Sequence, residues 1–382
     1  LAQGDPLGGQ FGAVEAAMTP PEAAKQVEMM ASALSNIPAQ RPGVVDTYVL
    51  VASLWNDPVF ENEAKEAAAI LARRYDAQER TIILSAGRGA GLPRAYPAAT
   101  PDNFQAALGK IGATIDPNED LVVVFVTSHG APDGAVALQE KGRMGGALRA
   151  LPLRDAFAQA GIRNKVVIVS ACFSGYFILP FSDDNTVVLT AAAADKTSFG
   201  CEPQRDWTFF GDALFNHALR GGQNLVDGFD EALVTISKWE DDMHAKWQAL
   251  PTGQRSQQPE PQPSNPQKNV GEAAMAVVNK AESFGNAINC AGLLSFALDR
   301  VKTGRPLKGL ADVAAVTQAQ AAAQAKANTE GAARKRSPQD IAKSIATVSA
   351  NTVQVFSTQV PEVSAHAARC AAPATPPAPS GG

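Results

Sequence analysis

The chain has 382 residues, of which 45% are hydrophobic and 19% charged, and its formal net charge is −5 at pH 7. This composition is ordinary for a globular protein with a sizeable core, and its mild acidity argues against a nucleic-acid partner. No apolar run reaches the ~18–20 residues that a membrane-spanning helix needs, so we expect no membrane span. The four cysteines and four histidines lack metal-site spacings, and we therefore expect neither a metal nor a cofactor.

The N-terminal segment, residues 1–40, is predicted to contain one helix, over 21–34. The chain begins with Leu1 and Ala2 rather than Met, and this pair suits the end of a secretory cleavage site. We therefore expect a periplasmic or secreted protein, with a cytoplasmic one as the alternative.

Residues 41–272 alternate between strand-like and helix-like patterns. The strand-like runs are rich in Val, Ile and Leu without polar alternation, which indicates strands buried on both faces. Between them, apolar residues three or four apart indicate helices. This alternation predicts an α/β fold with a mostly parallel sheet. The expected strands are 46–52, 81–84, 121–129, 165–172 and 186–190. The expected helices include one that begins at residues 100–102 and others over 152–160, 207–220 and 224–245. A hairpin or long loop is expected over 134–148.

The C-terminal part has a different composition. Five prolines between residues 251 and 267 exclude a continuous helix there. Residues 273–370 are rich in alanine and are predicted to form a helical extension, whereas 371–382 are predicted to be disordered. Cys290 and Cys370 bracket the extension and could form a disulfide in an exported protein.

Two short segments carry the chemistry. His129 and Gly130 follow one apolar strand. A hairpin or long loop and a helix come next along the chain, and Cys172 follows the strand after them. Ligands bind where the carboxyl ends of parallel strands converge, so we expect both side chains at one site. The thiol would be the nucleophile and the imidazole its general base. The N–H groups of Gly130 and Cys172 are candidates for an oxyanion hole.

Structural explanations exist for each of these residues. A cysteine at a strand end is often a small buried hydrophobe, and a histidine there can be a capping or core residue. The glycine-rich loop at 87–91 lacks the spacing of a phosphate-binding motif, and the sequence around Cys172 lacks the serine-hydrolase elbow. The patterns therefore favour a cysteine hydrolase over a nucleotide-binding protein or a serine hydrolase.

These segments and those downstream resemble the legumain family of cysteine peptidases, and bacterial members in particular. The resemblance covers roughly residues 41–272 and is carried by the strand–His129–Gly130 and strand–Ala–Cys172 segments. Further similarity lies in the stretches Thr-Ala-Ala at 190–192, Thr-Ser-Phe-Gly-Cys at 197–201, Thr-Phe-Phe-Gly-Asp at 208–212 and Pro-Gln at 266–267.

The resemblance implies a caspase-like three-layer sandwich and a peptidase that cuts peptide or protein substrates through a thioester on Cys172. It also implies that Ser170, Ser198 and Asp212 belong to the substrate pocket. Ser170 stands where legumain has Glu, and an Arg of that pocket has no equivalent, so a basic or small polar substrate residue is expected. Asn56 or Asp57 could orient His129.

Two other functions share this fold. A transamidase would use the same two residues and resolve the thioester with an amine instead of water. A catalytically silent caspase-fold module would only bind its partner. The helical extension is a candidate intramolecular inhibitor, because legumain-like enzymes often carry C-terminal prodomains.

Overall fold

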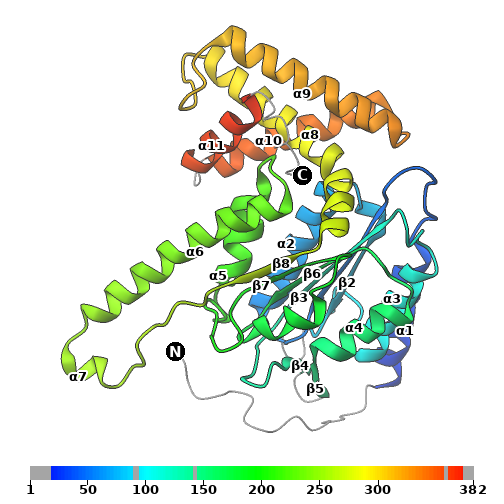
Figure 1. Ribbon diagram of the computed structural model, residues 1–382, viewed down its shortest axis with the longest axis vertical. Helices are drawn as coiled ribbons and strands as arrows, with labels where there is room; N and C mark the ends of the chain where they lie inside the picture. Colours follow the sequence, from blue (N-terminus) through cyan, green and yellow to red (C-terminus); the bar gives the residue numbers. More distant parts are fainter. Residues whose placement is uncertain (1–18, 89–93, 141–143, 357–359, 373–382) are drawn as a thin grey trace, which may run out of the picture. The chain divides into compact units, whose positions relative to one another are not determined.

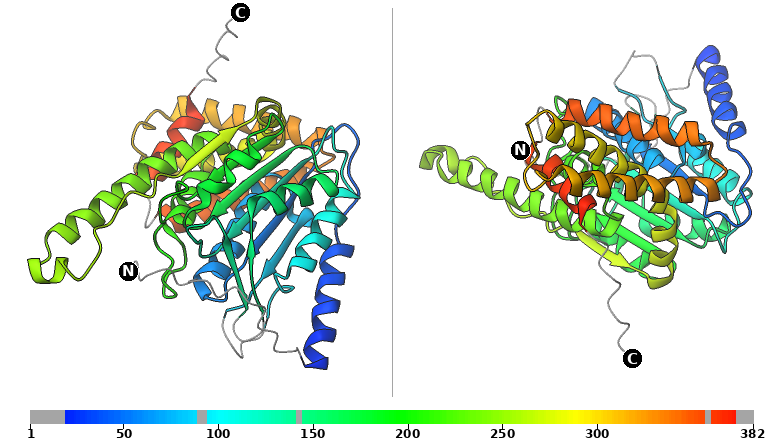
Figure 2. Two further views of the ribbon diagram at one scale, coloured as in Figure 1. Left: turned by 60° about the horizontal axis from the view of Figure 1, so that its bottom comes forward. Right: turned by 90° about the horizontal axis from the view of Figure 1, so that it is seen from above.

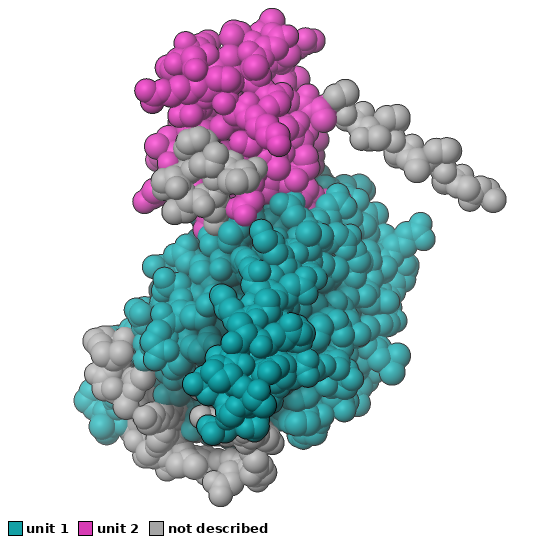
Figure 3. Space-filling model, turned by 90° about the vertical axis from the view of Figure 1, so that its left-hand side faces the viewer, with its two compact units in different colours: residues 1–218, 225–281 teal, residues 219–224, 282–382 magenta. Residues whose placement is uncertain are grey.

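The computed structural model describes residues 19–88, 94–140, 144–356 and 360–372. The pair Leu1 and Ala2, most of the glycine-rich loop and most of the predicted disordered tail lie outside these residues. The chain divides into two compact units, which Figure 3 colours separately. The first comprises residues 1–218 and 225–281, and the second comprises 219–224 and 282–382. Each is described by itself below.

The first unit is built on a six-stranded sheet with the strand order β2-β1-β3-β6-β7-β8 (Figure 1). The first five strands in this order run parallel, and β8 is antiparallel to β7. All residues of β1, β3, β6 and β7 are buried, as expected for strands covered on both faces. The strands are β1 (Thr47–Ser53), β2 (Thr81–Ser85), β3 (Leu121–Thr127), β6 (Lys165–Ser170), β7 (Thr186–Thr190) and β8 (Gln267–Val270).

Helices cover the two faces of the sheet (Figures 1 and 2). On one face, alternate strand side chains form a continuous apolar core with α1, α3 and α4. On the other face α2 packs on β1 and β3, and Phe125 of β3 contacts Phe215 edge to face at 4.7 Å between ring centroids. This three-layer α/β architecture confirms the predicted fold class. The helices are α1 (Pro20–Ser35), α2 (Pro58–Arg74), α3 (Pro101–Gly112), α4 (Ala150–Gln159) and α6 (Leu225–Gln248).

A separate hairpin, β4 (Val136–Glu140) with β5 (Met144–Leu148), forms in the segment where a hairpin or long loop was expected. Two other local features differ from the sequence-based expectation. The helix expected over 207–220 is divided into α5 (Phe209–Gly211), a π-helix η4 (Asp212–His217) and a 3₁₀ turn. Strand β8 was not expected, because it is a short, half-exposed edge strand directly after the proline-rich stretch.

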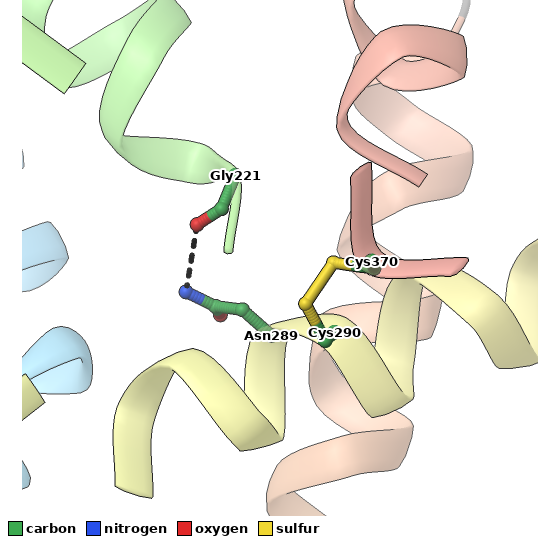
Figure 4. Close-up of a disulfide and its surroundings, with 4 residues drawn as sticks. All are labelled: Gly221, Asn289, Cys290 and Cys370. Carbon is green, nitrogen blue, oxygen red and sulfur yellow. Dashed lines mark hydrogen bonds between the residues drawn. A yellow bond between two sulfur atoms is a disulfide. The ribbon is translucent and has the colours of Figure 1, made fainter. Parts of the chain in front are cut away.

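The second unit is helical, as predicted for the extension. Its helices enclose two apolar clusters of their own, one around Phe296 and one around Phe284. Cys290 and Cys370 form a disulfide, so the pair that the sequence allowed is bonded (Figure 4). The helices are α8 (Glu272–Lys302), which begins in the first unit, α9 (Val313–Ala333), α10 (Pro338–Phe356) and α11 (Val360–Ala371). Across the described residues, no helix combines the length and the apolar character needed to cross a membrane.

Candidate active site

Two neighbouring strands bring His129 and Cys172 to the same edge of the sheet. Thr127 and Ser170 are direct partners at the carboxyl ends of β3 and β6, and the N–H of Ser128 donates to the carbonyl of Ser170 at 3.1 Å. His129 and Cys172 each lie two positions beyond the last residue of their strand. The parallel register therefore delivers both side chains at the same level, as the sequence pattern predicted.

Gly130 lies where the two chain segments approach most closely. A Cβ atom at this position would lie 1.8 Å from the carbonyl oxygen of Cys172, so no side chain fits. The backbone N–H of Gly130 is among the groups that oppose the rise in the pKa of the Cys172 thiol, so it lies near the sulfur. The N–H groups of Gly130 and Cys172 thus both border the sulfur, where an oxyanion hole requires its donors.

The His129 ring lies in an aromatic notch and is one-fifth exposed. Trp55 and Phe60 pack edge to face against it, with centroid distances of 4.9 and 5.0 Å. The carboxylate of Asp57 lies 4.0 Å from Nε2, so of the two candidates for orienting the ring, Asp57 faces it. The His129 carbonyl accepts a hydrogen bond from the N–H of Ala137, which fixes the segment to the hairpin.

Cys172 has a partly buried thiol that contacts Ser198. Its sulfur accepts from the N–H of Ser198 at 3.3 Å and lies 3.8 Å from the Ser198 hydroxyl. Burial raises the pKa of the thiol, and the surrounding N–H groups only partly oppose this shift. A neutral resting thiol needs a base to become a nucleophile, and this requirement suits the neighbouring imidazole.

The turn after Cys172 has a backbone conformation that is unusual for its residue type. Phe173 has φ of 58°, in the left-handed region that bulky residues rarely adopt. Its N–H donates to the carbonyl of Lys196 at 2.8 Å, which holds the turn in place. Backbone strain of this kind is concentrated at functional sites. Here it turns the chain sharply out of β6 immediately after Cys172.

Beneath the site lies Glu63 of α2, whose side chain is completely buried. Its carboxylate accepts hydrogen bonds from the hydroxyls of Thr127 at 2.7 Å, Thr208 at 2.9 Å and Ser170 at 3.4 Å. Burial raises the pKa of this carboxyl from 4.5 to about 7, and the three hydrogen bonds oppose the shift.

The three residues predicted to line the substrate pocket have different surroundings. Ser198 contacts the reactive sulfur, and its side chain is partly exposed. Asp212 is also partly exposed; it accepts from the amide of Asn216 at 2.8 Å and lies 3.5 Å from Nε2 of His217. Ser170 is buried, and its hydroxyl lies 3.1 Å from that of Thr208.

Sequence reasoning missed Glu63. Its position could have been found from the helical pattern, because Glu63 lies three residues after Phe60 and four before Ala67 on the buried face of α2. A charged residue inside an apolar stripe indicates a buried partner or a functional role.

The described residues contain no group of three or more His, Cys, Asp or Glu side chains that could hold a metal ion.

The three-layer fold, with a mostly parallel six-stranded sheet between helices, is consistent with the caspase-like class of folds. The model of the peptidase C13 family, which is the legumain family, matches residues 98–245. This match covers His129, Cys172, Ser198 and Asp212 and confirms the family resemblance. It implies a cysteine peptidase or a transamidase. No curated protein matches the chain.

Proposed function

We propose that this protein is a cysteine endopeptidase in which Cys172 is the nucleophile and His129 the general acid and base. One observation carries the proposal: the register of β3 and β6 delivers both residues to one sheet edge, with Gly130 between them. A buried structural cysteine would need neither a histidine on the neighbouring strand end nor a side-chain-free N–H beside its sulfur.

The reaction follows from this arrangement. His129 takes the thiol proton while the sulfur attacks the peptide carbonyl carbon, and the N–H groups of Gly130 and Cys172 stabilise the oxyanion. The C–N bond then breaks, the leaving amine takes the proton from His129, and a thioester remains on Cys172. Water, deprotonated by His129, attacks the thioester; the C–S bond breaks, the carboxylate product leaves, and His129 returns the proton to the Cys172 sulfur. The Asp57 carboxylate, 4.0 Å from Nε2, faces the imidazole ring and helps to orient it.

A fluorogenic peptide library assayed with the wild type and with Cys172→Ala tests the proposal. We expect Cys172→Ala to lose all hydrolysis and His129→Ala to lose at least about a thousandfold in kcat/KM. His244→Ala is the matched control, because His244 lies on α6, exposed and paired with Glu260. Binding of substrate without cleavage by the wild type would instead support the silent binding module.

We propose further that Ser198 and Asp212 contribute to the primary specificity pocket. Asp212 is partly exposed, and it lies near enough to Glu63 for the two carboxyl groups to repel one another. A pocket with this acidic character favours a basic or small polar residue before the cleaved bond. Asp212→Asn should reduce the preference for a basic residue without abolishing turnover. An unchanged preference in this variant would contradict the assignment.

The same library distinguishes hydrolysis from transfer, because the peptidase C13 family allows either a peptidase or a transamidase. With an added amine such as hydroxylamine, a transamidase yields mainly the amide-type product, whereas a peptidase yields mainly the free acid. The ratio of the two product masses decides between them.

Two further proposals concern the context of the enzyme. We propose that the protein is exported, since disulfides such as Cys290–Cys370 persist chiefly in oxidising compartments. Cell fractionation tests this. We also propose that the helical extension inhibits the peptidase, which a chain ending after residue 281 tests. Higher activity of the shortened chain supports inhibition, and equal activity contradicts it.

A further inference from the structure

Four hydroxyl residues form one row across the carboxyl ends of four parallel strands. Ser85 of β2 is the direct partner of Ser53 of β1, Ser53 is the partner of Thr127 of β3, and Thr127 is the partner of Ser170 of β6. All four side chains are buried. Polar groups that are buried inside a core must find hydrogen-bond partners, so the row needs acceptors.

Two glutamates of α2 supply those acceptors at different ends of the row. The hydroxyl of Ser53 donates to that of Ser85, which donates to Glu61 at 2.6 Å. At the other end, Thr127 and Ser170 donate to Glu63. Glu61 is therefore the acceptor for the hydroxyl pair of β1 and β2. Glu63 is the acceptor for the hydroxyls of the two strands that precede His129 and Cys172.

Glu63 also holds a third segment. The hydroxyl of Thr208 donates a hydrogen bond to Glu63. The oxygen of that hydroxyl accepts a hydrogen bond from the N–H of Gly211 and so caps α5. The fit is tight, because a Cβ atom at Gly211 would lie 1.7 Å from a carboxylate oxygen of Glu63. Asp212, the next residue, begins the π-helix.

We propose that Glu63 is a positioning residue of the peptidase, whose carboxylate fixes the strand ends of His129 and Cys172 to each other and to the Thr208 turn. The inference rests on the proposed function. Thr127 and Ser170 each lie two residues before a reactive residue, so a shift of either strand end changes the distance between thiol and imidazole. Misplacement of reacting groups by about 1 Å can cost about a hundredfold in rate.

Substitution by glutamine tests this role without emptying the site. Glu63→Gln keeps the side-chain shape but replaces one acceptor oxygen with a donating NH₂ group, so it cannot accept from all three hydroxyls. Thr127→Val removes the same link from the other side, whereas Thr127→Ser keeps it. Glu61→Gln is the matched control, because it makes the same change in the same helix and the same hydroxyl row but away from both reactive residues.

Two measurements are made on every variant: kcat and KM for the best library peptide, and the rate at which iodoacetamide alkylates Cys172 at pH 7. Peptide mapping separates Cys172 from Cys201, the other free cysteine. The alkylation rate reports how well the imidazole takes the thiol proton, and it can be measured whether or not any peptide is cleaved.

We expect Glu63→Gln and Thr127→Val each to lower kcat and the alkylation rate by about tenfold or more, with KM changed less than about twofold. The double variant Glu63→Gln with Thr127→Val should have a kcat only slightly below that of the less active single variant, because both substitutions disrupt the same hydrogen bond between Thr127 and Glu63. Thr127→Ser and Glu61→Gln should stay within about twofold of the wild type.

Two results would overturn the role of Glu63. One is an alkylation rate and kcat in Glu63→Gln within twofold of the wild type, even if its unfolding temperature falls. The other is an equal loss in Glu61→Gln. Failure of the proposed function gives a different result, namely no Cys172-dependent cleavage by the wild type, and the alkylation series then decides the role of Glu63 alone.

Discussion

The sheet unit and the helical unit reach stability by different means. In the sheet unit, four central strands bury every residue between two helical layers, and their side chains are mostly Val, Ile and Leu. In the helical unit, α9 is rich in small residues: eleven alanines lie between residues 311 and 333. Its apolar clusters are smaller, and a disulfide joins α8 to α11. Small side chains bury less apolar area, so the disulfide contributes a larger share of the stability of the helical unit.

The sheet unit can be disrupted at its reactive edge. Gly130→Ala introduces a Cβ atom 1.8 Å from the Cys172 carbonyl oxygen, which forces the two strand ends apart. We expect kcat/KM to fall by about 10²–10³, the size of losing an oxyanion donor. Steady-state kinetics measure the loss, and circular dichroism checks that the variant folds. Activity near the wild-type level would show that the close approach is unnecessary.

The helical unit should depend on its disulfide. Cys290 and Cys370 are 80 residues apart, and the replacement Cys290→Ser with Cys370→Ser frees that loop in the unfolded state. We expect a loss of about 4 kcal/mol in the unfolding free energy of this unit. Calorimetry with and without reductant measures it. Reductant should lower the melting of the wild type and leave the double variant unchanged; equal melting of all samples would contradict the prediction.

The sheet unit should also respond to pH through Glu63. Its pKa is about 7 in the folded protein and 4.5 when unperturbed, so folding favours the protonated carboxyl. The associated stability is present below pH 4.5 and is lost as pH rises to about 7, a total of about 3 kcal/mol. Urea unfolding of the wild type and Glu63→Gln between pH 4.5 and 8 measures the difference. Other titrating groups, such as Asp120, cancel in that comparison, and parallel curves would contradict the assignment.

A smaller effect concerns two helical glycines, one in each unit. In α8, a Cβ atom at Gly292 would lie 2.5 Å from Cβ of Val348 in α10, whereas at Gly109 in α3 nothing lies within 4 Å. Gly292→Ala should cost about 1–2 kcal/mol net, because overpacking outweighs the gain in helix propensity. Gly109→Ala should instead stabilise by about 0.5–1 kcal/mol. Thermal unfolding of the two variants tests whether the close approach of α8 to α10 is what makes a side chain at position 292 costly.

Local patterns in the sequence were sufficient to predict most of the fold of this protein. Buried strands are apolar runs, and helices show their period, so the parallel sheet, the flanking helices and the helical extension could all be predicted. That His129 and Cys172 lie beside neighbouring strand ends could be predicted because each closely follows such a run. The close approach at Gly130 was consistent with this reading, although only the structure shows why a side chain cannot fit.

Other features were decided by contacts between residues distant in the chain. Glu63 is 64 residues from Thr127 and 145 from Thr208, and only the strand register and the packing of α2 bring their side chains together. Strand β8 forms because β7 offers it an edge, and Cys290 bonds Cys370 because α8 and α11 meet. Sequence patterns report local periodicity and burial. The partners of a buried carboxylate, an edge strand or a thiol depend on which distant elements pack beside them.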